Sequence, residues 1–222
     1  MVSPHLDDAV FGCGDAVRSR PGSLVVTVFA GGPESWVTPT SWDAAAGFGP
    51  GVDAISHRRN EDREALALLG ADPVWLPFWD SQYGRPTRKA DVTAALADTL
   101  ASFDPRVVLI PFGLWHSDHR LVHEAAVALL PDNSRRRWVA YEDAIYRRFP
   151  DAGLEERLAA LTARGIATVP LPSSGPASAG KRRSLACYRS QLRALSTPGR
   201  PGAADALEPE RHWALVPASA TP

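Results

Sequence analysis

Short apolar runs alternate along the chain with longer stretches in which apolar residues recur every three or four positions. The apolar runs cover residues 24–30, 74–79, 106–112 and, more weakly, 166–171. Nearly continuous apolar runs of this length are typical of strands that are covered on both faces of a sheet. We therefore predict these four strands, preceded by a short first strand that ends near His5.

Helical periodicity fills the intervals between these runs. Apolar residues recur with helical spacing over 8–20, 58–69, 90–103, 118–130 and 181–195, and Gly70 stands where the second of these helices should stop. Repetition of strand and helix predicts an α/β domain with a mainly parallel sheet and helices on both faces. A last apolar stretch at 211–216 is predicted to add one edge strand.

Two stretches interrupt the alternation. Residues 31–56 are rich in Gly, Pro, Ser and Thr and carry Trp36 and Trp42, and residues 170–180 form a Pro/Ser/Ala/Gly connector. In a compact domain, a loop as long as the first is usually functional or mobile. The sequence has no internal repeat, so we predict a single domain over residues 1–222, with 192–222 as a C-terminal tail.

Composition narrows the class of protein. The chain has 222 residues, of which 45% are hydrophobic and 22% charged, and its formal net charge is −1. This charge lacks the basic excess of a general nucleic-acid binder, and no apolar stretch approaches the roughly 20 residues that span a bilayer. The first residues show no secretory signal, and two cysteines, Cys13 and Cys187, cannot form a disulfide framework. We therefore expect a soluble, cytoplasmic protein with no nucleic-acid partner and no membrane insertion.

One imidazole and two carboxylates lie together where the first strand should end. His5, Asp7 and Asp8 occupy the carboxyl edge of the predicted sheet, where open α/β domains bind ligands. Neutral imidazole and carboxylate are ordinary zinc ligands. At a turn, His5 and Asp8 can both face one ion, which leaves Asp7 free to face a bound water. The competing interpretation is structural: an aspartate caps the following helix, and His5 is an ordinary, partly buried histidine.

A second histidine cluster follows the strand at 106–112. His116, Asp118 and His119 lead into a predicted helix, again at the carboxyl end of a strand. If the two loops are neighbours, His116 or His119 can supply a third ligand, and three protein ligands with an open position are typical of catalytic zinc. His123 lies four residues after His119 and allows a competing pair on one helix face. Because the Glu of an H-E-x-x-H motif is missing, we favour a structural role for His123.

These motifs resemble those of the LmbE-like, or PIG-L, family of zinc-dependent N-deacetylases. Residues 4–8 followed by 11–14 are similar to the family's P-H-x-D-D signature, and residues 116–119 are similar to its H-P-D-H motif. Residues 58–70 resemble an R-x-x-E helix that ends in Leu-Gly, Asp80 matches a further acidic position, and 188–191 resemble a Y-x-S-Q element. The resemblance covers about residues 2–191, in the family's order.

The resemblance implies a Rossmann-like α/β domain in which zinc serves to remove an N-acetyl group, usually from a GlcNAc-containing sugar. Three side chains would hold Zn²⁺ or another divalent ion: His5, Asp8 and His119. Three would act in catalysis: Asp7 as the general base, His116 as the oxyanion or acid partner, and Asp118 as the residue that orients His116. Two would face the substrate: Arg58 and Asp80.

Three positions depart from the family's pattern. Ala9 replaces a glutamate that many members have, Ser117 replaces the usual proline, and Leu114 stands where some members have a tyrosine that assists the oxyanion. Oxyanion stabilisation would then rest on zinc and His116, unless a loop tyrosine such as Tyr83 approaches the site.

The sequence determines the substrate least. Trp36 and Trp42 can stack on a sugar ring, or they can simply pack the domain. We expect a small-molecule N-acetylated sugar or glycoconjugate as substrate, and the chain is compatible with a homo-oligomer. Alternatives are an amidase for a thiol conjugate, a deacylase for a natural-product acyl amide, and a catalytically inactive metal-binding relative. A dinucleotide site at residues 12–14 is disfavoured, because Val17 replaces the third glycine of G-x-G-x-x-G.

Overall fold

The computed structural model describes residues 1–130, 135–173 and 175–217. Its strands are β1 (Val2–Ser3), β2 (Ser23–Thr27), β3 (Ala71–Trp75), β4 (Val107–Pro111), β5 (Arg137–Tyr141), β6 (Ile166–Pro170) and β7 (His212–Pro217). Its helices are α1 (Asp8–Arg18), α2 (Ser41–Ala46), α3 (Ala54–Ala67), α4 (Lys89–Phe103), α5 (Ser117–Val127), α6 (Leu154–Ala163), α7 (Ala179–Leu185) and α8 (Arg189–Leu195), with 3-10 turns η1 (Ser81–Tyr83) and η2 (Ala204–Leu207). Strands and helices alternate through most of the chain, which confirms the predicted α/β class.

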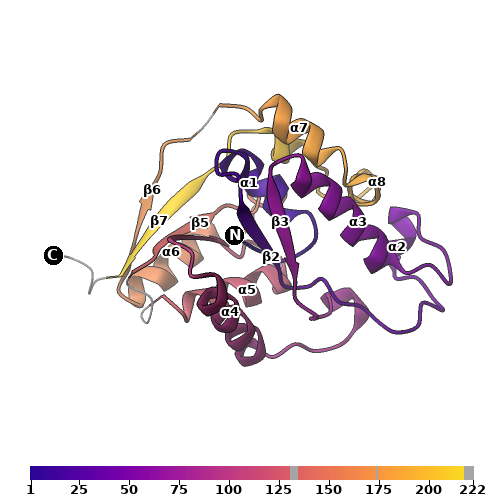
Figure 1. The fold of residues 1–222 in the computed structure, drawn as a ribbon, viewed down its shortest axis with the longest axis horizontal. Coiled ribbons are helices and arrows are strands. Elements are labelled where there is room, and N and C mark those ends of the chain that lie inside the picture. The colour runs from indigo at the N-terminus through magenta and orange to yellow at the C-terminus, as the bar shows by residue number, and fades with distance from the viewer. Residues whose placement is uncertain (131–134, 174, 218–222) are drawn as a thin grey trace.

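The strands form two hydrogen-bonded sheets. Strands β1, β2 and β3 make a parallel sheet, and the second sheet has the order β4-β5-β7-β6. Within the second sheet β4 and β5 are parallel, whereas β7 is antiparallel to both of its neighbours. Contacts between β1 and β4 place the sheets side by side, and Figure 1 shows the helices arranged around them. The mainly parallel arrangement is therefore confirmed.

Strand β7 corrects one prediction. The stretch 211–216 was expected at an edge, but β7 lies between β5 and β6, where Ala140 pairs with Trp213 and Thr168 pairs with Leu215. Periodicity shows that a segment is extended and gives no information about its neighbours. Insertion between two strands satisfies the backbone groups on both sides of β7, which an edge position would leave open.

The helices also differ in detail from the predictions. The single helix expected over 181–195 is two helices, α7 and α8, separated at residues 186–188. Tyr188 in this break is fully buried, and its hydroxyl donates a hydrogen bond of 2.8 Å to Asp62 of α3. Helices α2 and α6 and strand β5 lie in stretches for which no element was predicted.

Two glycines let α1 approach its neighbours closely. A Cβ at Gly12 would come within 2.8 Å of the Tyr141 ring, and one at Gly14 would come within 2.8 Å of the Lys181 side chain. The helix also bends at Cys13, where φ is −142° and ψ is 19°. The glycines that resemble part of a dinucleotide-binding loop are therefore needed for packing.

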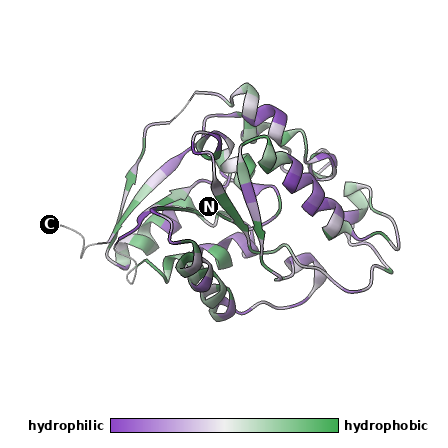
Figure 2. Cartoon of the chain, in the orientation of Figure 1, coloured by the Kyte–Doolittle hydropathy of each residue, from purple (hydrophilic) through white to green (hydrophobic). Residues whose placement is uncertain are grey.

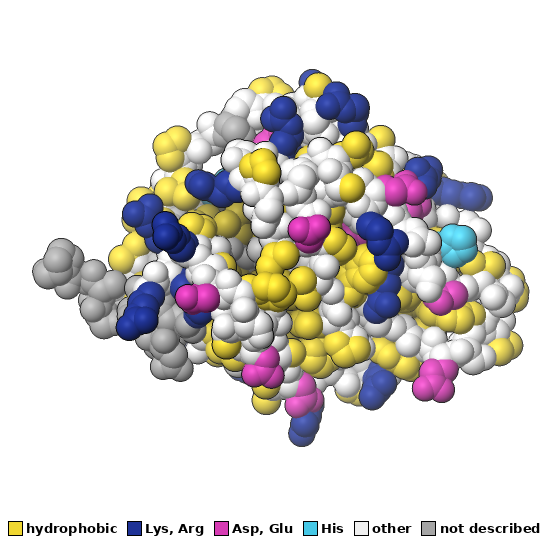
Figure 3. All heavy atoms as spheres, in the orientation of Figure 1, with side chains coloured by type: hydrophobic (Ala, Val, Ile, Leu, Met, Phe, Trp, Pro, Cys, Tyr) yellow, Lys and Arg dark blue, Asp and Glu magenta, His cyan; other side chains and the backbone are white. Residues whose placement is uncertain are grey.

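Hydropathy and charge are distributed differently over the fold. Figure 2 shows the strands as largely hydrophobic and α3 as largely hydrophilic, although α3 buries Arg58, Glu61 and Asp62. On the face drawn in Figure 3, charges of both signs are interspersed. Across the described ranges, no helix combines the length and apolar character that a bilayer crossing requires.

Candidate metal centre and active site

Acidic and histidine side chains gather where several strands end. The segments after β1, β3, β4 and β5 carry His5, Asp7, Asp8, Asp80, His116, Asp118, His119 and Asp143. All of them except His116 are buried, with no more than 8% of any residue exposed. The structure thus brings the two sequence motifs together at the carboxyl edge of the sheets, the usual ligand-binding edge of open α/β domains.

His5, Asp8 and His119 form one compact group. Oδ2 of Asp8 lies 3.2 Å from Nδ1 of His5 and 3.1 Å from Nε2 of His119. One ligand atom from each residue lies within 4.8 Å of the other two. A single ion can therefore contact all three side chains.

The turn after β1 holds the first two of these residues in place. The Ser3 hydroxyl donates to the carbonyl of His5 at 2.7 Å and accepts the backbone N–H of Ala9 at 3.0 Å. The backbone N–H of His5 donates to Oδ2 of Asp8 at 2.9 Å. Ala9, which replaces the family's glutamate, thus contributes its backbone to the turn, with Ser3 as the polar partner.

Asp143, which was not predicted, fixes the orientation of His119. Its Oδ1 lies 2.6 Å from Nδ1 of His119, and its Oδ2 accepts the backbone N–H of Leu114 at 2.9 Å. A proton on Nδ1 leaves Nε2 of His119 with the lone pair that a metal needs. The only sequence signal for Asp143 is its position just after an apolar stretch, since it belongs to none of the recognised motifs.

The environment of Nε2 of His119 indicates that this site can bind a cation. This atom is buried and lies 3.1 Å from Oδ2 of Asp8, but no contact within the described chain has the geometry of a hydrogen bond to it. Asp7, Asp8, Asp80 and Asp118 surround the histidines, so the cluster carries more carboxylates than the single arginine, Arg58, can neutralise. Two imidazoles and a carboxylate are a donor set that zinc accepts, and the charge suits a divalent ion.

A second group of ligand atoms shares one residue with the first. His5, His116 and Asp118 also converge, with Nε2 of His5 3.1 Å from Oδ2 of Asp118. In this group, however, Nδ1 of His116 accepts the backbone N–H of Asp118 at 3.2 Å, and Asp118 also accepts the N–H of Ser81. Nδ1 of His116 and Oδ2 of Asp118 therefore make hydrogen bonds to backbone N–H groups, whereas the contact of Nε2 of His119 with Asp8 lacks the geometry of a hydrogen bond.

The placement of Asp118 corrects its predicted role. The Asp118 carboxylate was expected to orient His116, but it faces His5 and Ser81. His116 is the N-cap of α5 and is oriented instead by the backbone N–H of residue 118. The physical reason is the start of the helix: its free N–H groups need an acceptor, and the imidazole of His116 provides one.

Asp7 occupies the N-cap position of α1, but its carboxylate makes no capping hydrogen bond. Asp7 therefore stands at the cap position that the structural interpretation expected, but its carboxylate does not cap the helix. Burial and the neighbouring Asp8 raise the pKa of Asp7 to about 7. A buried carboxylate that is unused by the helix and adjacent to a metal-ligand candidate is available for proton transfer.

The histidines of the cluster differ in their electrostatic environment. Burial alone would lower the pKa of His5, but Asp80 and the hydrogen bonds to Asp118 and Asp8 raise it well above its usual value. Burial also opposes charge on His119, while Asp8 and Asp143 raise its pKa to about 9. For His116, burial and the two other histidines lower the pKa to about 4. Of the three, His116 is thus the histidine whose pKa lies below its ordinary value.

Arg58 reaches the cluster from α3. It is 2% exposed, its Nη1 lies 3.6 Å from Oδ2 of Asp80, and its Nε and Nη1 lack hydrogen-bond partners in the part of the chain described. Asp80 in turn lies 3.9 Å from Nε2 of His5. Arg58 and Asp80, the residues predicted to face the substrate, therefore lie next to the metal-ligand candidate His5.

The Y-x-S-Q element holds α3 in position. Glu61 accepts both the backbone N–H and the hydroxyl of Ser190, at 2.9 and 2.6 Å, and Asp62 accepts the hydroxyl of Tyr188. These bonds connect α8 and its N-terminal residue to α3, one turn beyond Arg58. Two sequence motifs far apart in the chain therefore act together to position the arginine.

The two tryptophans of the long loop are placed differently. The indole N–H of Trp42 donates to Gln191 at 3.0 Å, and the Arg200 guanidinium stands 4.9 Å from its ring, so these contacts pack α2 against the C-terminal part. Trp36 packs edge-on against Tyr83, with ring centroids 5.5 Å apart. Tyr83, which was considered for the oxyanion, donates its hydroxyl to Asp43 at 3.4 Å.

An aromatic cluster that the sequence did not reveal borders His116. The Tyr146 ring stacks on Trp115 at 5.1 Å and on His116 at 6.0 Å, and it meets His119 edge-on at 5.1 Å. Phe149 packs edge-on against Trp115. Trp115 is 40% exposed and has a φ of 57°, an uncommon conformation for a bulky residue, which is typical of functional sites.

A family model matches the part of the chain that carries both His/Asp motifs. The model described as PIG-L: GlcNAc-PI de-N-acetylase matches residues 1–130, a stretch that contains both His/Asp motifs. Among curated proteins, no match was found.

Solved structures of deacetylases have the same fold. The A40926 pseudoaglycone deacetylase is 25% identical and has a TM-score of 0.75, with 99% of this chain and 97% of that one covered. A zinc-inhibited form of the teicoplanin deacetylase is 24% identical, has a TM-score of 0.79, and covers 97% of this chain and 96% of its own. The N,N′-diacetylchitobiose deacetylase from Pyrococcus horikoshii is 17% identical, with a TM-score of 0.53 over 98% of this chain and 83% of that one.

Proposed function

The chain belongs to the PIG-L family of GlcNAc-PI de-N-acetylases, and we propose that it hydrolyses the N-acetyl amide of an amino sugar on a small molecule, with zinc as its metal. The products are acetate and a free amine. The observation that carries this proposal is the buried His5–Asp8–His119 group, whose ligand atoms lie within 4.8 Å of one another. Asp7 beside it is not used by the helix.

The residues of the cluster have different roles in the proposed amide hydrolysis. A zinc ion, when bound, lowers the pKa of water from about 15.7 to about 7 and polarises an amide carbonyl. His5, Asp8 and His119 would hold the ion, and Asp143, whose Oδ1 contacts Nδ1 of His119, would keep Nε2 free to serve as the ligand. Asp7 accepts the proton of the attacking water as the general base.

His116 supplies a hydrogen-bond donor. Because its Nδ1 accepts the backbone N–H of Asp118, the proton of the neutral imidazole is on Nε2. That N–H can donate to the oxygen that becomes negative when water attacks the amide. A single donor of this kind is typically worth about 10²–10³-fold in rate. Stacking on Tyr146 restricts the imidazole, so the donor is held in one orientation.

Two features support a sugar as the part that carries the amide. Arg58 has buried N–H groups without partners in the described chain, and sugar hydroxyls are suitable acceptors for them. A hollow of about 230 Å³ beside Asp118 is lined by Trp79, Arg85 and Leu121, among others. The similar solved structures are named as deacetylases of A40926 pseudoaglycone, of teicoplanin and of N,N′-diacetylchitobiose. An N-acetylated glycoconjugate is the substrate class that fits both features.

A deacylase for a natural-product acyl amide is the second candidate. The exposed Trp115 with Tyr146 and Phe149 offers an apolar, aromatic surface next to His116. Such a surface suits a longer acyl chain or an aromatic aglycone better than an acetyl group alone.

A metal-loaded assay tests the proposal. The purified chain is dialysed against zinc, and free-amine release is measured from N-acetylglucosamine, diacetylchitobiose, an N-acetylglucosaminyl glycopeptide and their N-decanoyl analogues. We expect stoichiometric zinc and turnover of the N-acetyl compounds. Turnover of the N-decanoyl analogues alone would favour the deacylase, and the absence of both zinc and amine release would reject the proposal.

Two variants decide between the candidate ligand sets. We expect His119→Ala to abolish zinc retention after dialysis, and His116→Ala to retain one equivalent of zinc while turnover falls by about 10²-fold or more. The opposite result would assign the ion to His5, His116 and Asp118 instead.

A further inference from the structure

The hydroxyl of Tyr146 sets this residue apart from the other tyrosines. The chain has four tyrosines, and Tyr146, in the turn after β5, is 7% exposed. The other three donate their hydroxyl hydrogens to groups of the protein: Tyr83 to Asp43, Tyr141 to the carbonyl of Val2, and Tyr188 to Asp62. Among the described residues, no group forms a hydrogen bond with the hydroxyl of Tyr146. Since buried tyrosine hydroxyls usually have a partner, this one is a candidate for contact with a ligand.

Hydrogen bonds before and after Tyr146 hold the turn that carries it. Its backbone N–H donates to the carbonyl of Asp143 at 3.0 Å, and its own carbonyl accepts the N–H of Phe149 at 3.0 Å. The neighbouring Arg147 donates from Nη1 to the carbonyl of Pro209 at 3.0 Å. The backbone of Tyr146 is therefore fixed in place, as an effective hydrogen-bond donor in catalysis requires.

The ring of Tyr146 lies against two histidines of the site. It stacks on His116, with the ring planes 22° and the centroids 6.0 Å apart, and it meets His119 edge-on at 5.1 Å. Trp115 also stacks on this ring, with a centroid distance of 5.1 Å. Together these contacts restrict the ring, and with it the direction in which the hydroxyl points.

The charges around the hydroxyl show which way it points. After burial, the groups that most raise the pKa of Tyr146 are Asp8 and Asp7. Asp143 raises it less, although Asp143 is only three residues away and its carbonyl accepts the N–H of Tyr146. Because electrostatic effects weaken with distance, the hydroxyl lies toward the Asp7–Asp8 pair. The raised pKa also keeps the hydroxyl protonated at neutral pH, so that it can act as a donor.

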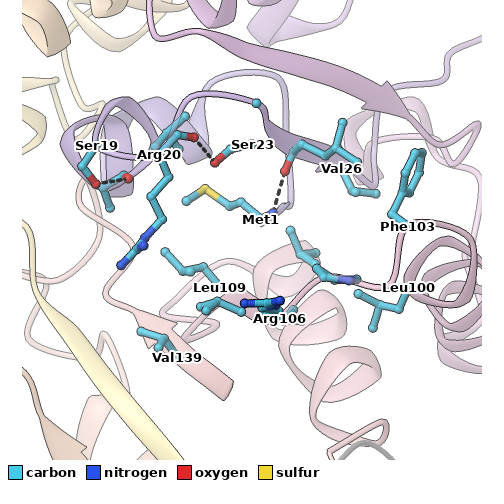
Figure 4. A pocket seen from close by; sticks show the side chains of 18 of the residues that line it. Met1, Ser19, Arg20, Ser23, Val26, Leu100, Phe103, Arg106, Leu109 and Val139 are labelled. Atoms are coloured by element: carbon cyan, nitrogen blue, oxygen red, sulfur yellow. Dashed lines mark hydrogen bonds between the residues drawn. The ribbon is translucent and has the colours of Figure 1, made fainter. Parts of the chain in front are cut away.

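The hollow drawn in Figure 4 is a separate feature of the molecule. It has a volume of about 770 Å³ and surrounds Met1, between the end of α4 and the start of β4, at the opposite ends of the strands. Neither Tyr146 nor any of the metal-ligand candidates lines it. A ligand that contacts the hydroxyl of Tyr146 is therefore expected at the candidate metal centre itself.

We propose that Tyr146 is a catalytic residue, whose hydroxyl donates a hydrogen bond to the oxygen of the scissile amide as that oxygen becomes negative. This role rests on the amide hydrolysis proposed above. The N–H at Nε2 of His116 donates to the same oxygen, so the two stacked side chains form a pair of donors. A carbonyl oxygen has two lone pairs and can accept both hydrogen bonds.

A donor without a protein partner suits this role. The hydrogen bond of Tyr146 forms only when a substrate supplies the acceptor, and it strengthens as negative charge develops on the oxygen. Interactions that are stronger in the transition state than in the ground state are the ones that raise kcat. The same hydroxyl contributes no hydrogen bond to the folded chain as described, so its effects on activity and on stability are separable.

The variant Tyr146→Phe removes the hydroxyl and retains the ring that stacks on His116. In the zinc-loaded chain we expect kcat to fall by about 10²–10³-fold, while KM and zinc content stay at the wild-type level. Tyr141→Phe, which removes a buried hydroxyl bonded to Val2, is the matched control and should leave kcat unchanged. A wild-type kcat in Tyr146→Phe would overturn the proposal. Loss of zinc from Tyr146→Phe would also overturn it, because the hydroxyl would then be a metal ligand.

Thermal unfolding of the same two variants gives a measurement that does not depend on activity. The melting temperature of Tyr141→Phe should fall by about 2–4 °C or more, because the carbonyl of Val2 loses its donor. The melting temperature of Tyr146→Phe should not fall. A fall as large as that of Tyr141→Phe would show that the Tyr146 hydroxyl has a structural partner, and it would reject the proposal.

Binding of a tetrahedral mimic separates this proposal from the proposed function. The methylphosphonamidate analogue of N-acetylglucosamine carries a charged oxygen in place of the oxyanion, and calorimetry should show that Tyr146→Phe binds it about 10–100-fold more weakly than the wild type does. Equal affinity would overturn the role of Tyr146 and leave the proposed function intact. If the wild type neither binds the mimic nor releases amine from any of the substrates above, the proposed function fails, and the role of Tyr146 fails with it.

Discussion

At the scale of single residues, Asp7 and Asp8 are neighbours in sequence with different roles in the structure. Asp8 contacts both imidazoles of the metal group, and against the effect of burial, His119 and His5 hold its pKa far below the usual range. Asp7 caps no helix N–H and has its pKa raised by burial and by Asp8. Asp8 is therefore suited to bind the metal, and Asp7 is suited to accept a proton. Metal-assisted hydrolysis requires both roles.

The role of Asp7 predicts the effect of Asp7→Asn. The amide is nearly isosteric but cannot accept a proton, so we expect zinc content to stay at the wild-type level while kcat falls by about 10²–10⁴-fold. Zinc content and free-amine release are measured on the same preparation. Asp98→Asn on the exposed side of α4 is the matched control and should leave both unchanged. Near-native turnover of Asp7→Asn would remove this residue from catalysis.

The contact of Asp143 with His119 predicts a loss of metal affinity. Asp143→Asn removes the carboxylate that keeps the proton on Nδ1 of His119, and we expect zinc to bind about 10–100-fold more weakly. Competition with a chromophoric chelator gives the affinity. Glu142→Gln, at the adjacent buried carboxylate that bonds Trp213, is the control. An unchanged zinc affinity in Asp143→Asn would show that the His119 tautomer does not depend on this residue.

At the scale of the element, α5 gives three histidines three different environments. His116 is the N-cap, His119 points into the cluster one turn later, and His123 is buried with Nδ1 2.9 Å from the carbonyl of Pro111. The helix can start here because Gly113 has a φ of 76° and a Cβ at this position would lie 2.7 Å from His123. The structural role predicted for His123 agrees with its burial and its backbone hydrogen bond.

The burial of His123 predicts a pH dependence of stability. Burial lowers its pKa from 6.5 to about 4. Because the folded-state pKa lies below the unfolded value, the contribution of His123 is complete above about pH 6.5 and is lost as the pH falls toward 4. The free energy of unfolding should fall by about 1.4 kcal/mol per pH unit in this window from His123 alone.

His123→Asn isolates this contribution. Asparagine retains a donor for Pro111 but does not titrate in this range. Denaturant unfolding at pH 6.5 and pH 5 should therefore show about 1.6 kcal/mol less loss of stability for the variant than for the wild type. Identical pH profiles would mean that His123 titrates normally in the folded protein.

At the scale of the whole molecule, the C-terminal part of the chain forms hydrogen bonds to α1, the N-terminal helix. Glu210 accepts the backbone N–H groups of Asp15 and Ala16 in α1, and it also accepts Nζ of Lys181 in α7 at 2.8 Å. Lys181 and Glu210 are 1% and 3% exposed at their side chains. The part of the chain after the family match thus supports the helix that begins with the metal-ligand candidates.

This buried pair predicts a large loss of stability on Lys181→Met. The variant leaves the Glu210 carboxylate buried without its cation, and we expect the free energy of unfolding to fall by about 3–5 kcal/mol. Chemical denaturation measures the loss. Lys89→Met changes the chain's other lysine, whose pair with Glu124 is exposed, and should have no measurable effect. Adding Glu210→Gln should recover part of the loss, since the uncompensated charge is removed.

Local patterns made much of this architecture predictable. Apolar periodicity located β2, β4, α1, α3, α4 and α5 to within a few residues, because it reports burial along a short segment. His5, Asp7 and Asp8 could be proposed together because they are adjacent in sequence. Asp143 could not, because its contact with His119 spans 24 residues and depends on β5 ending beside β4. Tyr146 escaped prediction for the same reason, since its ring reaches His116 only in the folded chain.

The sequence by itself determined the alternation of strands and helices and the ligand types available at two strand ends, since both depend on residue identity over a few positions. Only the tertiary structure decided that Asp143 contacts His119, that Asp118 faces His5, and that β7 lies between β5 and β6. These outcomes depend on contacts between residues far apart in the chain. Such contacts form where packing and hydrogen-bond satisfaction over the whole molecule are best, and no local pattern records that balance.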